Sequence, residues 1–149
     1  MDSFDRRLLD LVQRNNRLTY DALGDAVGLS SSAVRRRLKQ LREDGVIIAD
    51  VALADPAKLA ETVIISVHMK IESHETYATL SERMRDCPEV SQCYTVCGDT
   101  DFIIIAHFGN LTIYDGWAKA KLMSDPAIAR YTTHVVSGRI KYDTAIATE

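Results

Sequence analysis

Two short helical patterns joined by a glycine-containing turn place the strongest constraint on how this chain folds. The first follows Thr19, a predicted N-cap, and presents an apolar face at helical spacing made of Ala22, Leu23, Ala26 and Val27. Gly28 can adopt the left-handed conformation that ends a helix, and Ser30 is a predicted N-cap for the second. In the second helix the apolar residues recur at i, i+4 and i+7, as Val34, Leu38 and Leu41. Two helices joined by such a turn predict a helix-turn-helix.

The second helix carries three consecutive arginines at 35–37, although the chain has a net charge of −3. With its apolar residues facing inward, this helix turns a polar and basic face outward, made of Ser31, Ser32, Arg35, Arg36 and Lys39. A helix of this kind can enter the major groove of double-stranded DNA, with its first residues at base edges and its cations at phosphates. A solvated helix face is the alternative explanation of such a charge run. Its position after a helix-turn favours DNA contact.

The charge is unevenly distributed along the chain. Residues 1–48 hold nine Lys and Arg against seven Asp and Glu, whereas residues 49–149 hold nine against fourteen. The balance is therefore +2 in the first part and −5 in the second, which predicts two parts with different partners. Charges are screened within about 8 Å at physiological salt, so an acidic remainder does not prevent a basic helix from binding DNA.

The second part of the chain follows a different rhythm. Its expected elements, in order, are a strand at 62–71, a helix at 75–87, strands at 90–98 and 101–109, a helix at 110–125 and a strand at 131–147. This β-α-β-β-α-β order predicts a ferredoxin-like domain with helices on one face of an antiparallel sheet. The expected fold is α+β, with a winged-type helix-turn-helix domain at 1–48, a hairpin and linker at 49–61, and the ferredoxin-like domain at 62–149.

Several classes of protein do not fit the sequence. No apolar run is long enough to span a bilayer, and the charged N-terminus does not resemble a signal peptide, so we expect a cytoplasmic protein without membrane contact. Cys87, Cys93 and Cys97 lack the spacing of a zinc site or a disulfide framework. The four histidines are scattered, and phosphate-binding, dinucleotide-binding and nucleophile motifs are absent from the sequence. We therefore expect no enzyme activity, no cofactor and no metal.

The motifs in both parts resemble one family. The segments LTYDALGDAVGLS, AVRRRLKQL and GVI are similar to the N-terminal region of the Lrp/AsnC regulators, also called leucine-responsive or feast/famine regulators. PEVSQCYTVCGDTDFIIIAHF and YTTHVVSGRIK are similar to the effector-sensing domain of the same family. The resemblance implies a transcription regulator that forms homodimers, often assembles them into octamers, and binds a small effector, usually an amino acid, where dimers meet. A dimer in turn predicts a pseudo-palindromic DNA site.

The loop Gly98-Asp99-Thr100-Asp101 is the candidate effector site. Gly98 can adopt backbone angles that expose N–H groups to a carboxylate, and Asp101 offers an anion to an α-ammonium group. The roles of Asp99 and Asp101 can be exchanged, and a plain hairpin turn is the alternative explanation of this loop. By the family resemblance the final strand lies near this loop, which adds Thr133 and Ser137, although both can equally be solvent-facing hydroxyls.

Two other functions remain open at this stage. An architectural protein would coat DNA without responding to an effector. Sirohaem decarboxylases are enzymes with a similar two-domain architecture. The basic helix at 31–43 argues against a decarboxylase function for this chain.

Overall fold

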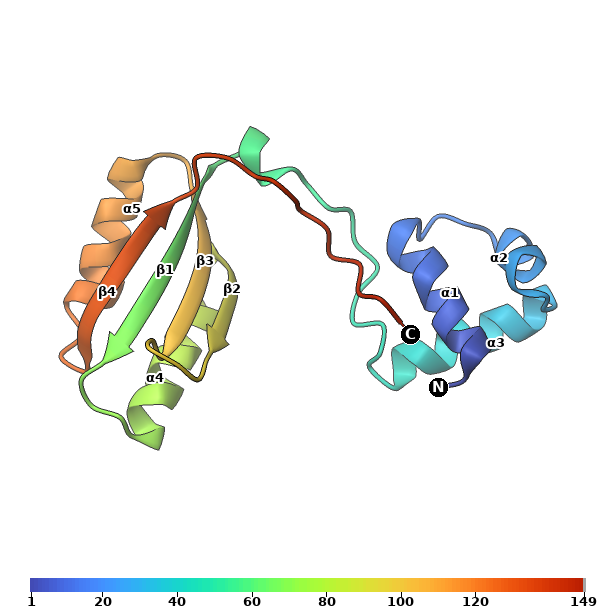
Figure 1. Ribbon diagram of the computed structural model, residues 1–149, viewed down its shortest axis with the longest axis horizontal. Helices are drawn as coiled ribbons and strands as arrows, with labels where there is room; N and C mark the ends of the chain where they lie inside the picture. The colour runs from blue at the N-terminus through green and yellow to red at the C-terminus, as the bar shows by residue number, and fades with distance from the viewer. Residues whose placement is uncertain (149) are drawn as a thin grey trace. The chain divides into compact units, whose positions relative to one another are not determined.

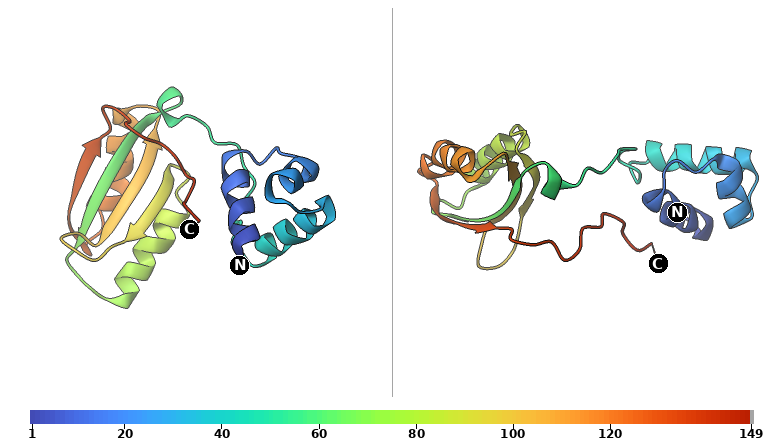
Figure 2. Two further views of the ribbon diagram at one scale, coloured as in Figure 1. Left: turned by 45° about the vertical axis from the view of Figure 1, so that its right-hand side comes forward. Right: turned by 90° about the horizontal axis from the view of Figure 1, so that it is seen from above.

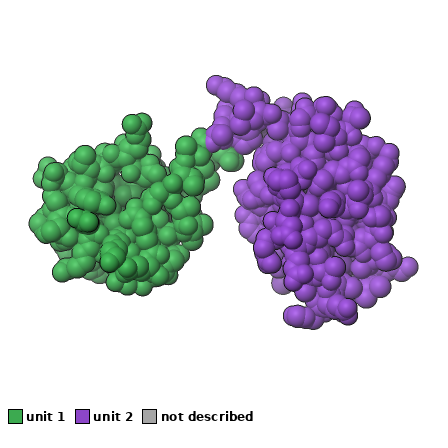
Figure 3. Space-filling view, turned by 180° about the vertical axis from the view of Figure 1, so that it is seen from behind, with its two compact units in different colours: residues 1–53, 140–149 green, residues 54–139 purple. Residues whose placement is uncertain are grey.

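The computed structural model describes residues 1–148, which form two compact units. The first contains residues 1–53 together with the end of the chain from residue 140, and the second contains residues 54–139 (Figure 3). No helix among the described residues is long and apolar enough to cross a membrane.

The first unit is built from three helices, α1 (Ser3–Arg14), α2 (Tyr20–Val27) and α3 (Ser31–Glu43) (Figure 1). Asp2, Thr19 and Ser30 cap them by accepting hydrogen bonds from backbone N–H groups of the first turn. The core joins the apolar faces of the three helices and consists of Leu8, Leu9, Leu23, Val27, Val34, Leu38 and Leu41. The predicted helix-turn-helix is confirmed.

The turn between α2 and α3 depends on two glycines. Gly28 has a φ of 77°, in the left-handed region where glycine is favoured, and its N–H donates to the Gly24 carbonyl. Gly24 lies inside α2, where a Cβ atom would meet the Leu29 carbonyl oxygen at 2.4 Å. The chain can therefore fold back this tightly only because position 24 has no side chain.

The second unit is the predicted ferredoxin-like domain. Its elements are β1 (Glu61–Met69), α4 (His74–Arg85), β2 (Val90–Thr95), β3 (Phe102–Phe108), α5 (Leu111–Ala118) and β4 (Ile128–Val135). A π-helical turn, Lys119–Met123, extends α5. The strands pair antiparallel in the order β2-β3-β1-β4, so β2 and β4 form the edges.

Both helices of this unit lie on one face of the sheet (Figure 2). Alternate residues of β1 and β3 point toward the helices and are buried, namely Val63, Ile65, Val67, Phe102, Ile104, Ala106 and Phe108. They pack against Leu80 and Met84 of α4 and against Trp117 and Leu122 from α5 and its extension. The opposite face of the sheet is not covered by any helix of its own unit.

Two segments differ from the prediction. The hairpin expected at 49–61 is absent: only a 3-10 turn, Pro56–Lys58, precedes β1. The final strand ends at Val135 instead of continuing to 147, because β1, its neighbour in the described part of the chain, begins at Glu61. The last bond of this ladder runs from the Val136 N–H to the Thr62 carbonyl. In both segments, residues that favour β-strands have no neighbouring strand in the described chain with which they could pair.

Candidate DNA-binding surface and candidate effector site

The outward face of α3 carries the cations that the sequence analysis assigned to DNA. Arg35, Arg36 and Lys39 are exposed, and so is Ser32 at the start of the helix. Arg35 and Arg36 form no ion pair with any residue of 1–148, whereas the Lys39 Nζ lies 3.4 Å from the Glu43 carboxylate on the surface. Such an exposed pair contributes little stability, about 0–1 kcal/mol, so it leaves Lys39 available to a phosphate.

Ser31, the remaining residue of the predicted set, has a partner within the protein. Its half-buried hydroxyl donates to the Asp21 carboxylate and so joins the start of α3 to α2. The Ser30 and Ser32 hydroxyls lie 3.1 Å apart at the same end of the helix. Ser31 therefore helps to fix the angle between the two helices.

Arg37 differs from the two arginines before it. Its Nη1 donates to Asp2, the N-cap of α1, and to Asp5 within that helix, each at 2.8 Å, and its guanidinium lies 5.5 Å from the centre of the Phe4 ring. The bonds to Asp5 and then Asp2 raise the pKa of Arg37. Arg37 thus ties α3 to α1 and does not belong to the DNA-facing set. Its spacing gives the signal, because it lies three residues after Val34 and four before Leu41.

In the predicted effector loop, Asp101 already has partners within the domain. Its Oδ2 accepts from the Met69 N–H at 2.7 Å, and its Oδ1 accepts from the Tyr77 hydroxyl. The hydrogen bond from Tyr77 is the main cause that lowers the pKa of Asp101, and the same bond raises the pKa of Tyr77 to about 12. Thr100 donates to the Val67 carbonyl at 2.7 Å. These two side chains fasten the β2–β3 turn to the end of β1.

Gly98 and Asp99 form the exposed part of the loop. Gly98 has a φ of 152°, a conformation that favours glycine, as the sequence analysis expected. Asp99 is exposed and has no hydrogen bond or ion pair with any other residue of 1–148. Between the two carboxylates, Asp99 is therefore the free one.

The structure does not bring the two residues of the final segment to this loop within one chain. Thr133 lies opposite Ile65, so its side chain faces the helix layer, where it bonds to the Tyr114 hydroxyl. Ser137 follows Val136, which pairs with Thr62, whereas Asp101 pairs with Val67. Five residues of β1 separate these two levels, which corresponds to about 16 Å along the strand.

No group of three or more His, Cys, Asp or Glu side chains within residues 1–148 is placed to hold a metal ion. A helix-turn-helix with an exposed basic helix in one unit and a ferredoxin-like domain in the other are the combination expected of a DNA-binding protein with a ligand-binding domain.

Comparisons with known proteins give the same class for both units. Residues 1–48 match the winged helix-turn-helix DNA-binding model, and residues 62–146 match the Lrp/AsnC ligand binding domain. The chain belongs to the Lrp/AsnC family, as its motifs suggested.

Individual relatives span the whole chain. An uncharacterized HTH-type transcriptional regulator of Sinorhizobium fredii is 36% identical and covers 100% of this chain and 89% of its own length. The crystal structure of an AsnC family transcriptional regulator from Agrobacterium tumefaciens has a TM-score of 0.88 at 32% identity, over 98% of this chain and 96% of that one. A transcriptional regulator from Neisseria meningitidis in complex with L-Met has the same TM-score and coverage at 28% identity.

Proposed function

We propose that this protein is a DNA-binding transcription regulator whose DNA affinity or assembly responds to a small metabolite, an amino acid in the first place. The observation that carries the proposal is the outward face of α3, where Arg35 and Arg36 are exposed and unpaired within residues 1–148. A regulator of this kind acts where the DNA lies, which in a bacterial cell is the cytoplasm.

The uncovered sheet face supports a homodimer. Ile64, Ile103 and Ile105 lie side by side on this face, because Ile64 pairs with Ile105 and neighbours Ile103 across the β1–β3 ladder. A second copy of the same face would remove these side chains from water, and a two-fold axis makes such a contact self-complementary. Two α3 helices related by that axis would read a pseudo-palindromic site with half-sites about 34 Å apart or a multiple of that spacing.

The effector site in this proposal is the exposed part of the 98–101 loop. Backbone N–H groups near Gly98 suit a carboxylate, and Asp99 suits an ammonium group. Thr133 and Ser137 would reach this loop only from another copy, which supports an assembly of dimers up to an octamer with effectors between subunits. The L-Met complex of the regulator from Neisseria meningitidis supports an amino acid as the effector class.

The test is fluorescence anisotropy with DNA from upstream of the protein's own gene, at two salt concentrations, with and without the twenty amino acids. We expect tight, salt-dependent binding that shifts with the amino-acid pool. Arg36→Ala should weaken binding, by about 1–3 kcal/mol at one base position if Arg36 reads a base. If it contacts phosphate, affinity should fall on all sequences and the salt slope should decrease by about 1.

The control is Lys70→Ala, which removes the same charge from an exposed position in the other unit. If Arg36→Ala and Lys70→Ala behave alike, α3 is not the recognition helix. Tight DNA binding whose affinity does not change with any of the amino acids would instead indicate a DNA-coating protein without effector control.

A further inference from the structure

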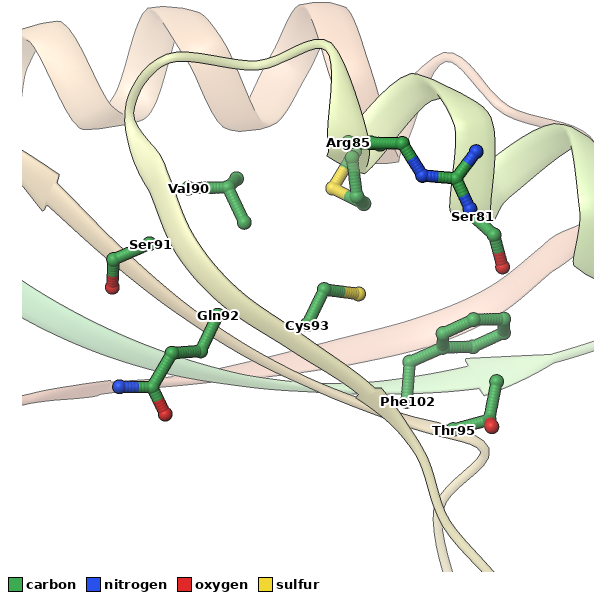
Figure 4. Close-up of a pocket in the computed structure, with 9 residues that line it drawn as sticks. Ser81, Arg85, Val90, Ser91, Gln92, Cys93, Thr95 and Phe102 are labelled. Carbon is green, nitrogen blue, oxygen red and sulfur yellow. The ribbon is translucent and has the colours of Figure 1, made fainter. Parts of the chain in front are cut away.

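The helix side of the sheet carries a cavity whose lining residues do not include the exposed 98–99 tip. It is a cleft of about 410 Å³ between the last turns of α4 and the edge strand β2, within the size range of small-molecule pockets (Figure 4). The helix contributes Ser81, Met84 and Arg85, the strand contributes residues 90–93 and Thr95, and Phe102 of β3 lies at the bottom.

The bottom of the cleft is apolar. Phe102 and Met84 belong to the buried core, and Cys93 directs its half-buried thiol into the cleft. Burial raises the pKa of the Cys93 thiol, so the sulfur stays protonated and neutral at physiological pH. An uncharged sulfur beside an aromatic ring suits an aliphatic group.

The rim of the cleft is polar and carries one positive charge. Arg85 is exposed, and its guanidinium has no ion pair or hydrogen bond with any other residue of 1–148. In Figure 4 it lies beside Ser81 on the helix side, opposite Cys93 and Thr95 of the strand. The hydroxyls of Ser81 and Thr95 are likewise free of partners within the described chain, so three polar groups are available to a ligand.

The charges around the cleft select one class of ligand. A guanidinium forms strong, bidentate hydrogen bonds with a carboxylate. No Asp or Glu is among the residues that line the cleft, so an α-ammonium group would lose water here without gaining an anionic partner. We propose that the cleft binds a small aliphatic monocarboxylate without an ammonium group, of which a branched-chain 2-oxo acid is the example.

This site is separate from the loop assigned to an amino acid, but the two are connected. Thr95 ends β2, and Gly98 follows three residues later in the exposed tip. A ligand on Thr95 therefore contacts the strand that leads directly into the loop. The chain would then distinguish an amino acid from its deaminated counterpart at two different places.

The experiment is isothermal titration calorimetry of the full chain with 4-methyl-2-oxopentanoate, followed by amide NMR shifts of Cys93 and Phe102. We expect saturable binding with shifts at both residues. Arg85→Gln should weaken this binding about tenfold or more, because it removes the charged partner of the carboxylate. Ser81→Glu should also weaken it, because a carboxylate on the rim repels the ligand.

Lys70→Gln removes an exposed positive charge elsewhere in the same unit and should leave the titration unchanged. Absence of binding, or binding that Arg85→Gln and Lys70→Gln affect equally, would overturn the assignment. DNA affinity measured without any ligand should be the same for Arg85→Gln and the unaltered chain, so failure of this site is distinguishable from failure of the proposed regulator function.

Discussion

Replacing Gly24 by alanine tests whether the close approach inside the helix-turn-helix controls the fold of the first unit. A Cβ at this position would lie 2.4 Å from the Leu29 carbonyl oxygen, and real Cβ atoms essentially never come within 3.0 Å of another heavy atom. The turn must therefore retreat by at least 0.6 Å, the difference of the two values. The obstacle is backbone, so no side chain can rotate away to make room.

Two opposing effects decide the magnitude. Alanine favours the helical state over glycine by about 1 kcal/mol in a helix interior. Overpacking that displaces backbone costs about 1–3 kcal/mol, and here it also strains the bonds by which the Gly28 and Leu29 N–H groups reach the Gly24 carbonyl at 2.8 and 3.0 Å. We expect a net destabilisation of the first unit of up to about 2 kcal/mol, together with weaker DNA binding because α3 is displaced.

Urea denaturation of the full chain, followed by circular dichroism, measures this change, and anisotropy measures the DNA affinity. Gly116→Ala is the matched control, since Gly116 lies inside α5 and a Cβ there would meet nothing within 4 Å. This control should stabilise the second unit by about 0.5–1 kcal/mol. If Gly24→Ala were as favourable as Gly116→Ala, the close approach would not constrain the turn and our reasoning would be wrong.

Three further substitutions test contacts within each unit. Tyr77→Phe removes the hydrogen bond that is the main cause of the lowered pKa of Asp101, so that pKa should rise toward its ordinary value. A lowered carboxyl pKa contributes stability that is present above about pH 4 and is lost as the pH falls through the folded pKa. The Tyr77→Phe variant should lose that contribution. Its urea midpoint should therefore differ less between pH 7 and pH 3 than that of the unaltered chain. Arg37→Ala should lower the thermal midpoint of the first unit, because Asp2 and Asp5 lose their common partner, and its DNA affinity at low temperature should fall less than that of Arg36→Ala. Gln13→Ala should expose the backbone of Ile146 to hydrogen exchange. The Gln13 side-chain amide donates to the Ile146 carbonyl at 3.0 Å and accepts from the Ile146 N–H at 2.8 Å. Unchanged protection of the Ile146 amide in NMR exchange would contradict this prediction.

The sequence predicted the orientation of α3 well because that orientation follows from local spacing. Val34, Leu38 and Leu41 define one face, and the residues on the opposite face are then determined by helical geometry. Arg37 was not predicted on this outward face, but its partners Asp2 and Asp5 could not be predicted, because they lie more than thirty residues away. Only the packing of α1 against α3 makes that ion-pair cluster visible.

The effector loop shows the converse case. Its turn and the backbone conformation of Gly98 could be predicted, since both depend on residues adjacent in sequence. That Asp101 bonds to Tyr77 and to the Met69 N–H could not, because these partners come from α4 and β1. Asp101 was assigned to a ligand on its charge and on the family resemblance, with Asp99 as the alternative, whereas in the structure protein groups already bond to its carboxylate.

At the end of the chain, the domain boundary given by sequence similarity differs from the boundary of the compact unit. The ligand-binding model extends to residue 146, but residues from 140 onward belong to the same compact unit as the three N-terminal helices. The Arg6 guanidinium donates to the Thr148 carbonyl at 3.3 Å, and the Thr148 hydroxyl donates to the Arg6 carbonyl at 3.0 Å. Because the same α1 holds α3 through Arg37, removal of residues 140–149 should lower the stability of the DNA-binding unit while leaving the β1–β4 pairing in place. Thermal unfolding that changed only in the second unit would show that the C-terminal segment stabilises the sheet instead.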